Sequence, residues 1–304
     1  MIIVQLLGGL GSQMSQYAYA KSLNLKGYIV KIDISAFDFY KLREYELDNF
    51  NIDLEISSEQ ENDFFKKNNI ITQLSNSFFG KNITLKLLNK IGNGQYNNRL
   101  IKEKNFLFDK NLLNIPDNSY LIGDFKSEKY FKEIRSILIN QFTIKHKCSI
   151  YFKKMKEKIK SAQNTCFIHV RRGDFATKKN VREIHGLCSK NYYLRAAEHI
   201  QSKFKDIHFF IFSDDISWCK ENINLKKMTF MENNNRYSPN EDIILMSMCD
   251  HSIIDHSAFC WWGAWLNQYP NSIVISPYRW FLDEKLQQES KDIYCDNWIK
   301  MPNN

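Results

Sequence analysis

The alternation of apolar and polar positions predicts that the chain opens with a strand–helix–strand unit. Residues 2–7 (IIVQLL) are typical of a buried strand, and a glycine turn follows them. Met14, Tyr17 and Ala18 then recur at helical spacing, which predicts a helix over 12–27 that ends at a glycine. Residues 28–34 (YIVKIDI) complete the unit as a second strand. Because the two strands are joined by a helix, the pattern predicts a parallel sheet.

The pattern is less regular over the next hundred residues. Residues 40–118 are rich in Asn and Lys and contain only short apolar clusters, so we expect mixed helix and loop there. Residues 119–125 (SYLIGDF) predict another strand, and 127–142 (SEKYFKEIRSILINQF) predict the helix that follows it.

A second strand–helix region occupies the C-terminal half. The predicted strands are residues 166–170, 208–213, 228–231, 252–256 and 272–277, and the helices between or after them are 191–204, 216–223, 240–249 and 258–269. We therefore expect an α/β protein of two Rossmann-like domains, residues 1–150 and 151–304, that face each other across a ligand cleft.

The junction of the two predicted domains is the most basic stretch of the chain. Phe152, Met155, Ile159 and Ala162 recur at helical spacing within 143–163, and lysines occupy the other positions. We prefer a surface helix that packs on its own domain. The alternative is a helix that contacts an anionic membrane surface.

Composition and charge limit the ligands, metal sites and cellular location that we expect for this protein. With 42 Lys and Arg against 34 Asp and Glu, the formal net charge is +8, which favours anionic ligands such as nucleotides. The seven cysteines are odd in number and widely spaced, so they predict neither a disulfide framework nor a paired zinc motif. The first residues lack the basic start of a signal peptide, and no apolar run approaches the length of a membrane span, so we expect a cytoplasmic protein.

Polar residues cluster where three predicted strands of the second domain end. Arg171 and Arg172 follow the first strand, and further polar residues follow two others: Ser213, Asp214, Asp215, His256 and Ser257. Ligands of parallel α/β sheets bind beyond the carboxyl ends of the strands. A guanidinium is always charged and matches phosphate oxygens two at a time, so this rim suits a diphosphate.

Each of these residues also has a structural interpretation. Asp174 is the nearest carboxylate that could pair with an arginine of the HVRRGD segment, and paired aspartates before a helix, such as Asp214 and Asp215, are common N-caps. His169 is uninformative alone. Their joint placement on one rim favours a binding site.

The N-terminal turn GGLGSQM follows a strand and opens a helix, as phosphate-binding turns do. Gly9 and Gly11 do not complete the dinucleotide fingerprint G-x-G-x-x-G. We expect a tight turn that brings its backbone and Gln13 to a ligand from the opposing domain, with Ser12 as the helix N-cap. Metal-binding motifs are also lacking, so we expect a reaction without a metal or other cofactor, in which arginines supply the counter-charge.

The sequence resembles the bacterial α-1,2-fucosyltransferases of glycosyltransferase family 11 along nearly its whole length. The matching landmarks, in order, are MIIVQLLGGLGSQMSQYAYAKSL, YELDNFNI, GDFKSEKYF, HVRRGDF, HGLCSKNYYLRA, FFIFSDD, HSAFCWWGAWLN, PYRWF and DIYCDNWIKM. The H-x-R-R-x-D element is shared more loosely with other fucosyltransferases that use GDP-fucose and have a GT-B-like fold.

The resemblance implies roles for individual residues. Arg171 would bind the diphosphate of GDP-fucose, with Arg172 shaping the same rim. His169 and Asp214 would contact guanine and Ser257 a phosphate, and Asp215 is a further candidate donor-binding residue. Gly9, Gly11, Ser12 and Gln13 would line the cleft on the acceptor side.

The implied reaction is an inverting transfer of L-fucose from GDP-β-L-fucose to the 2-hydroxyl of a terminal β-galactoside. Surface-polysaccharide synthesis and a lipid-linked acceptor at the inner membrane face are the expected setting, with no nucleic-acid partner. Arg171 and Asp174 are the candidate catalytic residues, Asp174 either as the general base or as a partner that orients an arginine. Glu183 and His185 lie behind it on the next loop.

Three positions depart from the family pattern: Ser12, His256 and Cys260, where the family usually has Asn, Asn and Ser. These departures keep two alternatives open. One is a transferase of the same fold with another donor or linkage. The other is an inactive module that binds a glycan or a nucleotide.

Overall fold

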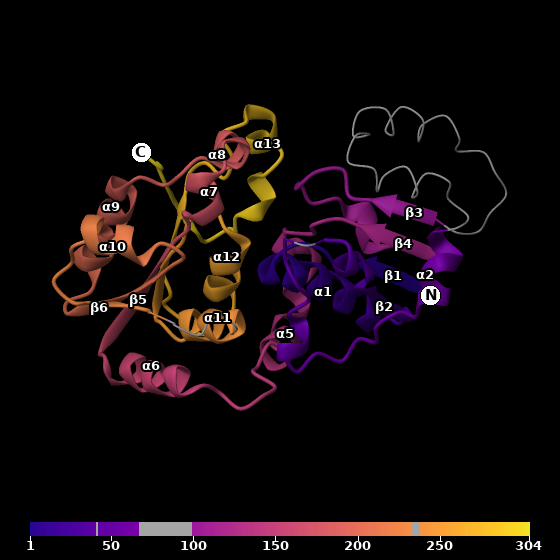
Figure 1. Ribbon diagram of the computed structural model, residues 1–304, viewed down its shortest axis with the longest axis horizontal. Coiled ribbons are helices and arrows are strands. Elements are labelled where there is room, and N and C mark those ends of the chain that lie inside the picture. The colour runs from indigo at the N-terminus through magenta and orange to yellow at the C-terminus, as the bar shows by residue number, and fades with distance from the viewer. Residues whose placement is uncertain (41, 67–98, 233–237) are drawn as a thin grey trace.

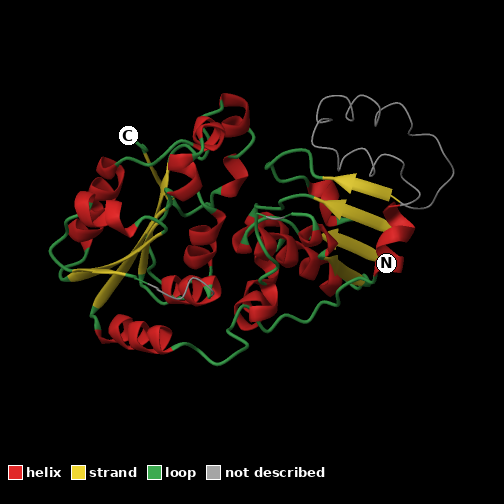
Figure 2. Ribbon diagram, in the orientation of Figure 1, coloured by secondary structure: helices red, strands yellow, loops and turns green. Residues whose placement is uncertain are grey.

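The computed structural model describes residues 1–40, 42–66, 99–232 and 238–304. Two parallel sheets with helices on their faces lie side by side (Figures 1 and 2). We call the half that contains the first sheet the N-terminal lobe and the half that contains the second sheet the C-terminal lobe.

The sheet of the N-terminal lobe has the order β2-β1-β4-β3, with every pair parallel. The predicted opening unit is confirmed as β1 (Ile2–Gln5), α1 (Leu10–Leu25) and β2 (Val30–Asp33). The predicted strand over 119–125 is β4 (Ser119–Ile122), and α2 (Glu59–Lys66) lies between β2 and β3 in sequence.

The expectation of mixed helix and loop over 40–118 missed a strand. β3 (Arg99–Lys102) pairs with β4 at the edge of the sheet. Short 3-10 helices occupy Ser35–Asp38, Leu47–Asn49 and Lys110–Leu113. Residues 67–98 of that stretch lie outside the described residues.

The single helix expected over 127–142 is wrong in its first half. Two 3-10 turns, Glu128–Tyr130 and Lys132–Ile134, precede α5 (Arg135–Gln141). Phe131, between the two turns, has a non-helical backbone with φ −144° and ψ 3°, and its buried ring stacks on Trp262 at 5.4 Å between ring centroids. Packing between the lobes therefore overrides the local helical pattern.

The sheet of the C-terminal lobe has the order β10-β9-β8-β5-β6-β7, again parallel throughout. The five predicted strands are confirmed as β5 (Asn164–Val170), β6 (Ile207–Ser213), β7 (Met228–Phe230), β8 (His251–Ile253) and β9 (Val274–Pro277). The four predicted helices are α9 (Lys190–Lys203), α10 (Ile216–Asn222), α11 (Pro239–Ser247) and α12 (Ala258–Trp265).

Several short elements were not predicted: α7 (Gly173–Thr177), α8 (Lys179–His185), α13 (Glu284–Gln288), a 3-10 turn at Lys291–Ile293 and the edge strand β10 (Ile299–Met301). Helix α12 also ends earlier than expected, at Trp265. Asn267, just beyond it, turns its side-chain amide toward the carbonyl of Cys249.

Helices cover both faces of the second sheet. One face packs on α9 and α10, and the other packs on α11 and α12, which share an apolar cluster with the N-terminal lobe. Successive side chains of β5 point to opposite faces of the sheet. Ile168 packs in the cluster with α9 and α10, whereas Phe167 packs in the cluster with α11 and α12. All seven cysteines are free thiols.

An aromatic seam joins the lobes and is formed by Phe131, Phe142, Trp261, Trp262 and Trp265. The indole N–H of Trp262 donates to the carbonyl of Gly11 at 2.9 Å and to Ser15 Oγ at 3.1 Å, which links α12 to α1. A Cβ on Gly11 would lie 2.5 Å from the backbone carbon of Ala258. Gly11 therefore lets the two helices approach at backbone distance.

The basic stretch forms the amphipathic helix α6 (Ile150–Ser161), whose residues Phe152, Met155 and Ile159 are buried as predicted. Ala162 lies just beyond the helix. Glu241 of α11 accepts hydrogen bonds from the backbone N–H and the hydroxyl of Ser149, the N-cap, so α6 packs on the C-terminal lobe. No helix in the described ranges is long and apolar enough to cross a bilayer. The domain boundary at residue 150 stays a prediction.

Candidate active site between the lobes

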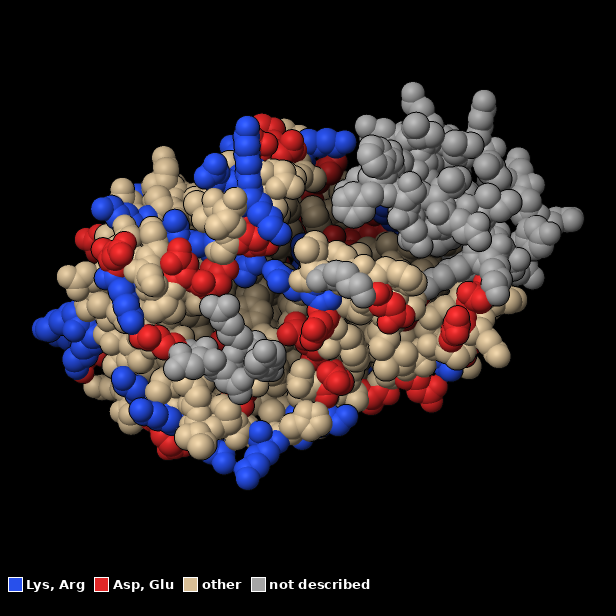
Figure 3. Space-filling view, viewed as in Figure 1, with Lys and Arg blue, Asp and Glu red and all other residues tan. Residues whose placement is uncertain are grey.

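A cavity of about 1640 Å³ opens between the two lobes. Basic and acidic side chains lie close together at its mouth (Figure 3). The turn after β1 and the ends of β3 and β4 line it from the N-terminal lobe, and the ends of β5, β6 and β8 line it from the other. Most of the predicted site residues border it: Gly9, Gly11, Ser12, His169, Arg171, Asp174, Asp214, Asp215 and Ser257. The expected position beyond the carboxyl ends of the strands is thus where the cavity lies.

Arg171 faces this cavity with its guanidinium held by two carboxylates. One terminal nitrogen lies 2.8 Å from Asp214 Oδ2, and the other lies 2.5 Å from Asp174 Oδ1. The side chain keeps 24% of its surface exposed. Since a guanidinium carries five N–H donors, these contacts orient its planar fork and leave donors for a ligand.

Arg172 points elsewhere. Its Nε lies 3.1 Å from Asp215 Oδ2, and its guanidinium lies 4.3 Å from the ring centroid of Trp218 on α10. The side chain does not line the cavity. The structure therefore separates the adjacent arginines: Arg171 reaches the ligand space, whereas Arg172 braces α10.

The aspartates after β6 have structural contacts as well. Asp215 is the N-cap of α10 and accepts from the backbone N–H of Trp218 at 3.1 Å. Asp214 accepts from the backbone N–H of Arg172 at 2.8 Å. The N-cap interpretation holds for Asp215, which still borders the cavity. Ser257 likewise caps α12 at the cavity wall.

The N-terminal turn differs from the expectation in two respects. Gly9, not Ser12, is the N-cap of α1, because Gly8 takes a positive φ of 92° and the helix begins two residues earlier than expected. Gln13 is fully buried and does not border the cavity. Its amide donates to the carbonyls of Gly8 and Glu44 and accepts from a backbone N–H, so it fixes the turn rather than reaching a ligand.

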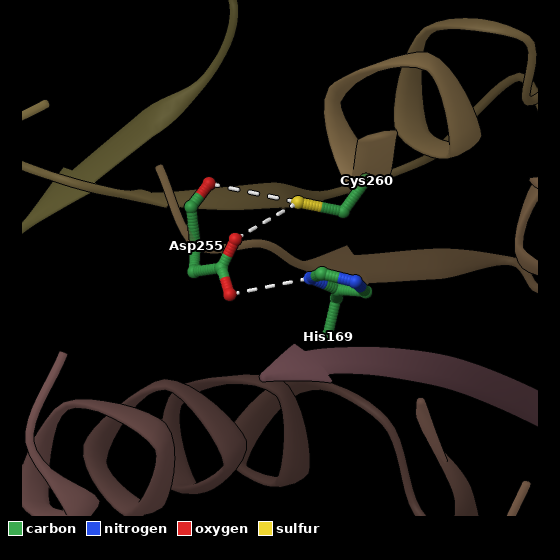
Figure 4. A group of neighbouring side chains, drawn as sticks. All are labelled: His169, Asp255 and Cys260. Atoms are coloured by element: carbon green, nitrogen blue, oxygen red, sulfur yellow. Dashed lines mark hydrogen bonds and ion pairs between the residues drawn. The ribbon is translucent and has the colours of Figure 1, made fainter. Parts of the chain in front are cut away.

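A buried carboxylate that the sequence reasoning missed lies beneath the rim. Asp255 follows β8 and has no exposed surface. Its Oδ2 lies 3.2 Å from His169 Nδ1 and accepts from the backbone N–H of Arg171, while its Oδ1 lies 3.3 Å from Cys260 Sγ (Figure 4). Asp255 therefore ties the end of β5 to the end of β8 at the residues that present the predicted donor site.

Charge complementarity stabilises this buried group, which we call the Asp255 network (His169, Asp255 and Cys260). Burial alone disfavours a carboxylate charge, yet His169, His256 and the Cys260 thiol hold the pKa of Asp255 below its usual value. The three residues offer ligand-type atoms within 4.8 Å of one another. Hydrogen bonds within the group and from Arg171 already engage the carboxylate, so it acts as a hydrogen-bonded anchor.

The sequence matches the profile of glycosyl transferase family 11 over residues 1–302. The chain belongs to glycosyl transferase family 11. An α-1,2-colitosyltransferase of Escherichia coli is 31% identical over 309 residues, covering 99% of this chain and 98% of that protein. The O-antigen biosynthesis glycosyltransferase WbnK of Escherichia coli is 30% identical over 318 residues, covering 97% and 99%. The chain is therefore a glycosyltransferase similar to the α-1,2-fucosyltransferases.

A solved structure shows the same fold. The crystal structure of the NodZ α-1,6-fucosyltransferase soaked with GDP-fucose aligns with a TM-score of 0.52 at 13% identity, covering 94% of this chain and 96% of that chain. The two parallel sheets facing a cleft are a GT-B fold, as the resemblance predicted.

Two of the departures from the family 11 pattern lie in the buried layer beneath the site. Cys260 belongs to the Asp255 network, and His256 is 2% exposed with its Nδ1 3.5 Å from Cys188 Sγ. His256 Nε2 lies 3.3 Å from the carbonyl of Gly186, and burial lowers the pKa of this histidine. Both residues are therefore accommodated by neighbours that match their hydrogen-bonding groups.

His185 and Glu183, which follow Asp174 in the chain, have different surroundings in this family 11 enzyme. His185 borders the cavity and stacks on Phe175 at 4.6 Å between ring centroids. Its Nδ1 is buried and has no hydrogen-bond partner among the described residues. Burial, reinforced by His256 and Lys126, lowers the pKa of His185 to about 4, so the ring is neutral at pH 7. Glu183 is exposed, lies 3.9 Å from Lys179 and does not border the cavity.

Proposed function

We propose that this enzyme transfers L-fucose from GDP-β-L-fucose to the 2-hydroxyl of a terminal β-galactoside, with inversion at the anomeric carbon. The observation that carries the proposal is the position of Arg171, whose oriented guanidinium faces the cavity between the lobes at the end of β5. Family 11 membership and full-length similarity to an α-1,2-colitosyltransferase support the reaction class.

Arg171 would stabilise the departing nucleotide. The acceptor oxygen forms a bond to the anomeric carbon while the bond from that carbon to the phosphate oxygen breaks, and GDP leaves with the electron pair. Arg43, Arg171 and Arg172 pair with Asp174, Asp214 and Asp215, three cations against three anions, so this cluster of ion pairs carries no net charge. The diphosphate of the donor would therefore displace the carboxylates from Arg171. The guanidinium of Arg171 would then stabilise the negative charge that develops on the departing GDP.

Asp174 orients this arginine in the proposed mechanism. One of its oxygens contacts Arg171, and the other lies 3.9 Å from a terminal nitrogen of Arg43. Both carboxylate oxygens of Asp174 are thus directed toward guanidinium groups. This arrangement supports the orienting role over the general-base role that the sequence also left open.

His185 is the better placed proton acceptor. Its neutral ring borders the cavity with a buried, unpartnered Nδ1 in the described part of the chain. Replacing His185 with asparagine is expected to lower kcat for transfer about tenfold. The loss is smaller than for a general base whose pKa matches neutral pH, because a pKa of about 4 makes His185 a weak base.

The measurement is steady-state transfer with the Kd for GDP determined in parallel. Glu183→Gln, on the same helix but outside the cavity, is the control and should change kcat less than twofold. An unchanged kcat in His185→Asn would rule out the base.

A second donor is favoured by one of the relatives. Colitose is L-fucose that lacks the 3-hydroxyl, and an α-1,2-colitosyltransferase is 31% identical to this chain. The test offers GDP-fucose, GDP-colitose, GDP-mannose and UDP-sugars with a panel of β-galactosides, and mass spectrometry detects the product. Exclusive use of GDP-colitose would replace fucose in the proposal. GDP binding without transfer from any donor would favour the inactive binding module.

Surface-polysaccharide synthesis is the proposed setting, supported by similarity to an O-antigen biosynthesis glycosyltransferase. A lipid-linked acceptor would place the enzyme at the cytoplasmic face of the inner membrane. Helix α6 presents Lys153, Lys154, Lys158 and Lys160 to solvent, and basic side chains project along the lower edge of the C-terminal lobe in Figure 3.

Binding to anionic vesicles would test the surface role of α6. Each lysine near an anionic membrane contributes about 1 kcal/mol at low ionic strength. Lys153→Glu/Lys154→Glu is expected to weaken co-sedimentation with phosphatidylglycerol vesicles at least tenfold, and to leave transfer to a free galactoside unchanged. Equal sedimentation of the wild type with neutral vesicles would rule out an electrostatic membrane contact.

A further inference from the structure

The N-terminal lobe brings a partly buried glutamate to the cavity. Glu103 follows β3 and borders both the large cavity and a side pocket of about 480 Å³. Lys104 and Asn105 border both spaces as well. These three residues therefore separate the side pocket from the large cavity, and Glu103 borders both.

The backbone after β4 is built around this carboxylate. Glu103 Oε2 accepts from the backbone N–H of Asp124 at 2.7 Å and from that of Phe125 at 2.9 Å. Phe125 takes a positive φ of 47°, which is unfavourable for a side-chain-bearing residue. A Cβ on Gly123 would lie 2.6 Å from Glu103 Cβ. A strained residue and a glycine thus combine to hold one oxygen of Glu103.

The other oxygen lacks a partner. Glu103 Oε1 is buried and makes no hydrogen bond within the described ranges. An unsatisfied buried oxygen is costly, so a ligand hydroxyl that reached it from the cavity and donated a hydrogen bond would remove that cost. Burial also raises the pKa of Glu103 to about 7, against the opposing effect of the two backbone N–H groups and Lys126.

An aromatic wall next to Glu103 connects it to the catalytic rim. Phe106 stacks on Phe281 of the C-terminal lobe at 5.3 Å between ring centroids, and Lys126 Nζ lies 4.9 Å from the Phe106 centroid. Phe281 in turn lies 5.1 Å from the ring of His185. Aromatic faces with a few fixed polar groups are typical of sites for neutral, hydroxyl-bearing ligands.

We propose that Glu103 is the acceptor-binding carboxylate, whose Oε1 accepts a hydrogen bond from a sugar hydroxyl of the acceptor. The inference rests on the proposed transferase function and adds the place where the acceptor binds. The ligand class is a glycoside, because a sugar hydroxyl supplies the donor that the unpartnered carboxylate oxygen lacks. Gly9, Gly11 and Ser12 border the same cavity from the N-terminal lobe.

Glu103→Gln gives a sharp test because the change is isosteric. The amide oxygen would remain with the two backbone N–H groups, so the amide NH₂ would take the position of Oε1 and replace an acceptor by a donor. We expect the KM for the galactoside to rise at least tenfold, whereas the Kd for GDP and the rate of donor hydrolysis without acceptor stay within twofold of wild type.

The pH dependence supplies a second readout. In the wild type, kcat/KM for the acceptor should fall about tenfold per pH unit below 7, where Glu103 becomes protonated. Glu103→Gln should lose that dependence. Glu103→Asp, which keeps the charge but shortens the side chain, should also raise the KM at least tenfold.

Glu289→Gln is the matched control, since Glu289 borders the same cavity from the C-terminal lobe, and its KM for the acceptor should stay within twofold of wild type. An unchanged acceptor KM in Glu103→Gln, with wild-type transfer intact, would overturn the subsite and leave the proposed function standing. A wild-type enzyme that transfers no sugar from any donor would overturn the proposed function itself.

Discussion

Replacing Arg171 with alanine is expected to lower kcat/KM for sugar transfer at least a hundredfold, about 2.7 kcal/mol of transition-state stabilisation. The guanidinium faces the cavity and is the donor that the proposed mechanism places on the departing diphosphate. Truncation also leaves Asp174 and Asp214 without their shared cation, so the rim becomes anionic and repels the nucleotide. Initial rates with GDP-fucose and a β-galactoside, together with the Kd for GDP, measure both effects.

Two further variants define how the Arg171 result is interpreted. Arg171→Lys keeps the charge but loses the two-pronged fork, so it should recover only part of the rate. Arg195→Ala removes an exposed arginine on α9 that does not border the cavity, and should leave the rate within twofold. A fully active Arg171→Ala enzyme would remove the main support for the proposed function.

Replacing Asp255 with asparagine is expected to lower the free energy of unfolding by about 1.5 to 3 kcal/mol, the usual contribution of hydrogen bonds to a buried charged group. The amide oxygen would remain with His169 and the backbone N–H of Arg171, so the NH₂ would take the position of Oδ1 and turn a donor toward the Cys260 thiol, which now faces a carboxylate oxygen. Because the same contacts orient the donor rim, the Kd for GDP should also rise. Urea unfolding and calorimetric titration with GDP measure the two effects.

The difference in unfolding free energy between wild type and Asp255→Asn should depend on pH in one direction. The pKa of Asp255 is lower in the folded state than its ordinary value near 4, so the unfolded chain takes up the proton first as pH falls. The stability that Asp255 contributes is therefore complete above pH 4 and is lost below it, where wild type and Asp255→Asn should converge. Cys260→Ser keeps a donor toward Oδ1 and should change stability by less than about 1 kcal/mol. A constant difference down to pH 3 would contradict this account.

Most strands, and the edge of the sheet where the cavity lies, could be predicted from the sequence because both depend on local patterns. Buried parallel strands are continuous apolar runs, and their carboxyl ends meet at one edge of a sheet. Arg171 and Asp214 could be assigned to one rim for that reason. Two of the four edge strands, β3 and β10, were missed because they are short and partly polar, so their pairing depends on neighbours distant in the chain.

The direction of individual side chains could not be predicted in the same way. Arg171 and Arg172 are adjacent and chemically identical, and only the position of Trp218 and Asp215 shows which one turns away. Asp255 ends an apolar strand, which is a detectable signal, but its partners come from segments far apart in the sequence. Glu103 lies in a stretch without clear periodicity, and its role depends on the backbone of 123–125.

The aromatic seam limits how this scaffold can be recombined. The backbone of α12 touches α1 where Gly11 has no side chain, and the Trp262 indole is bonded to that same turn of α1. A chimaera that takes its acceptor-binding half from one homologue and its nucleotide-binding half from another would join surfaces shaped for different partners. Exchanging the halves therefore requires transplanting both sides of the seam as a unit, whereas grafting only the loops after β3 and β4 leaves that junction intact.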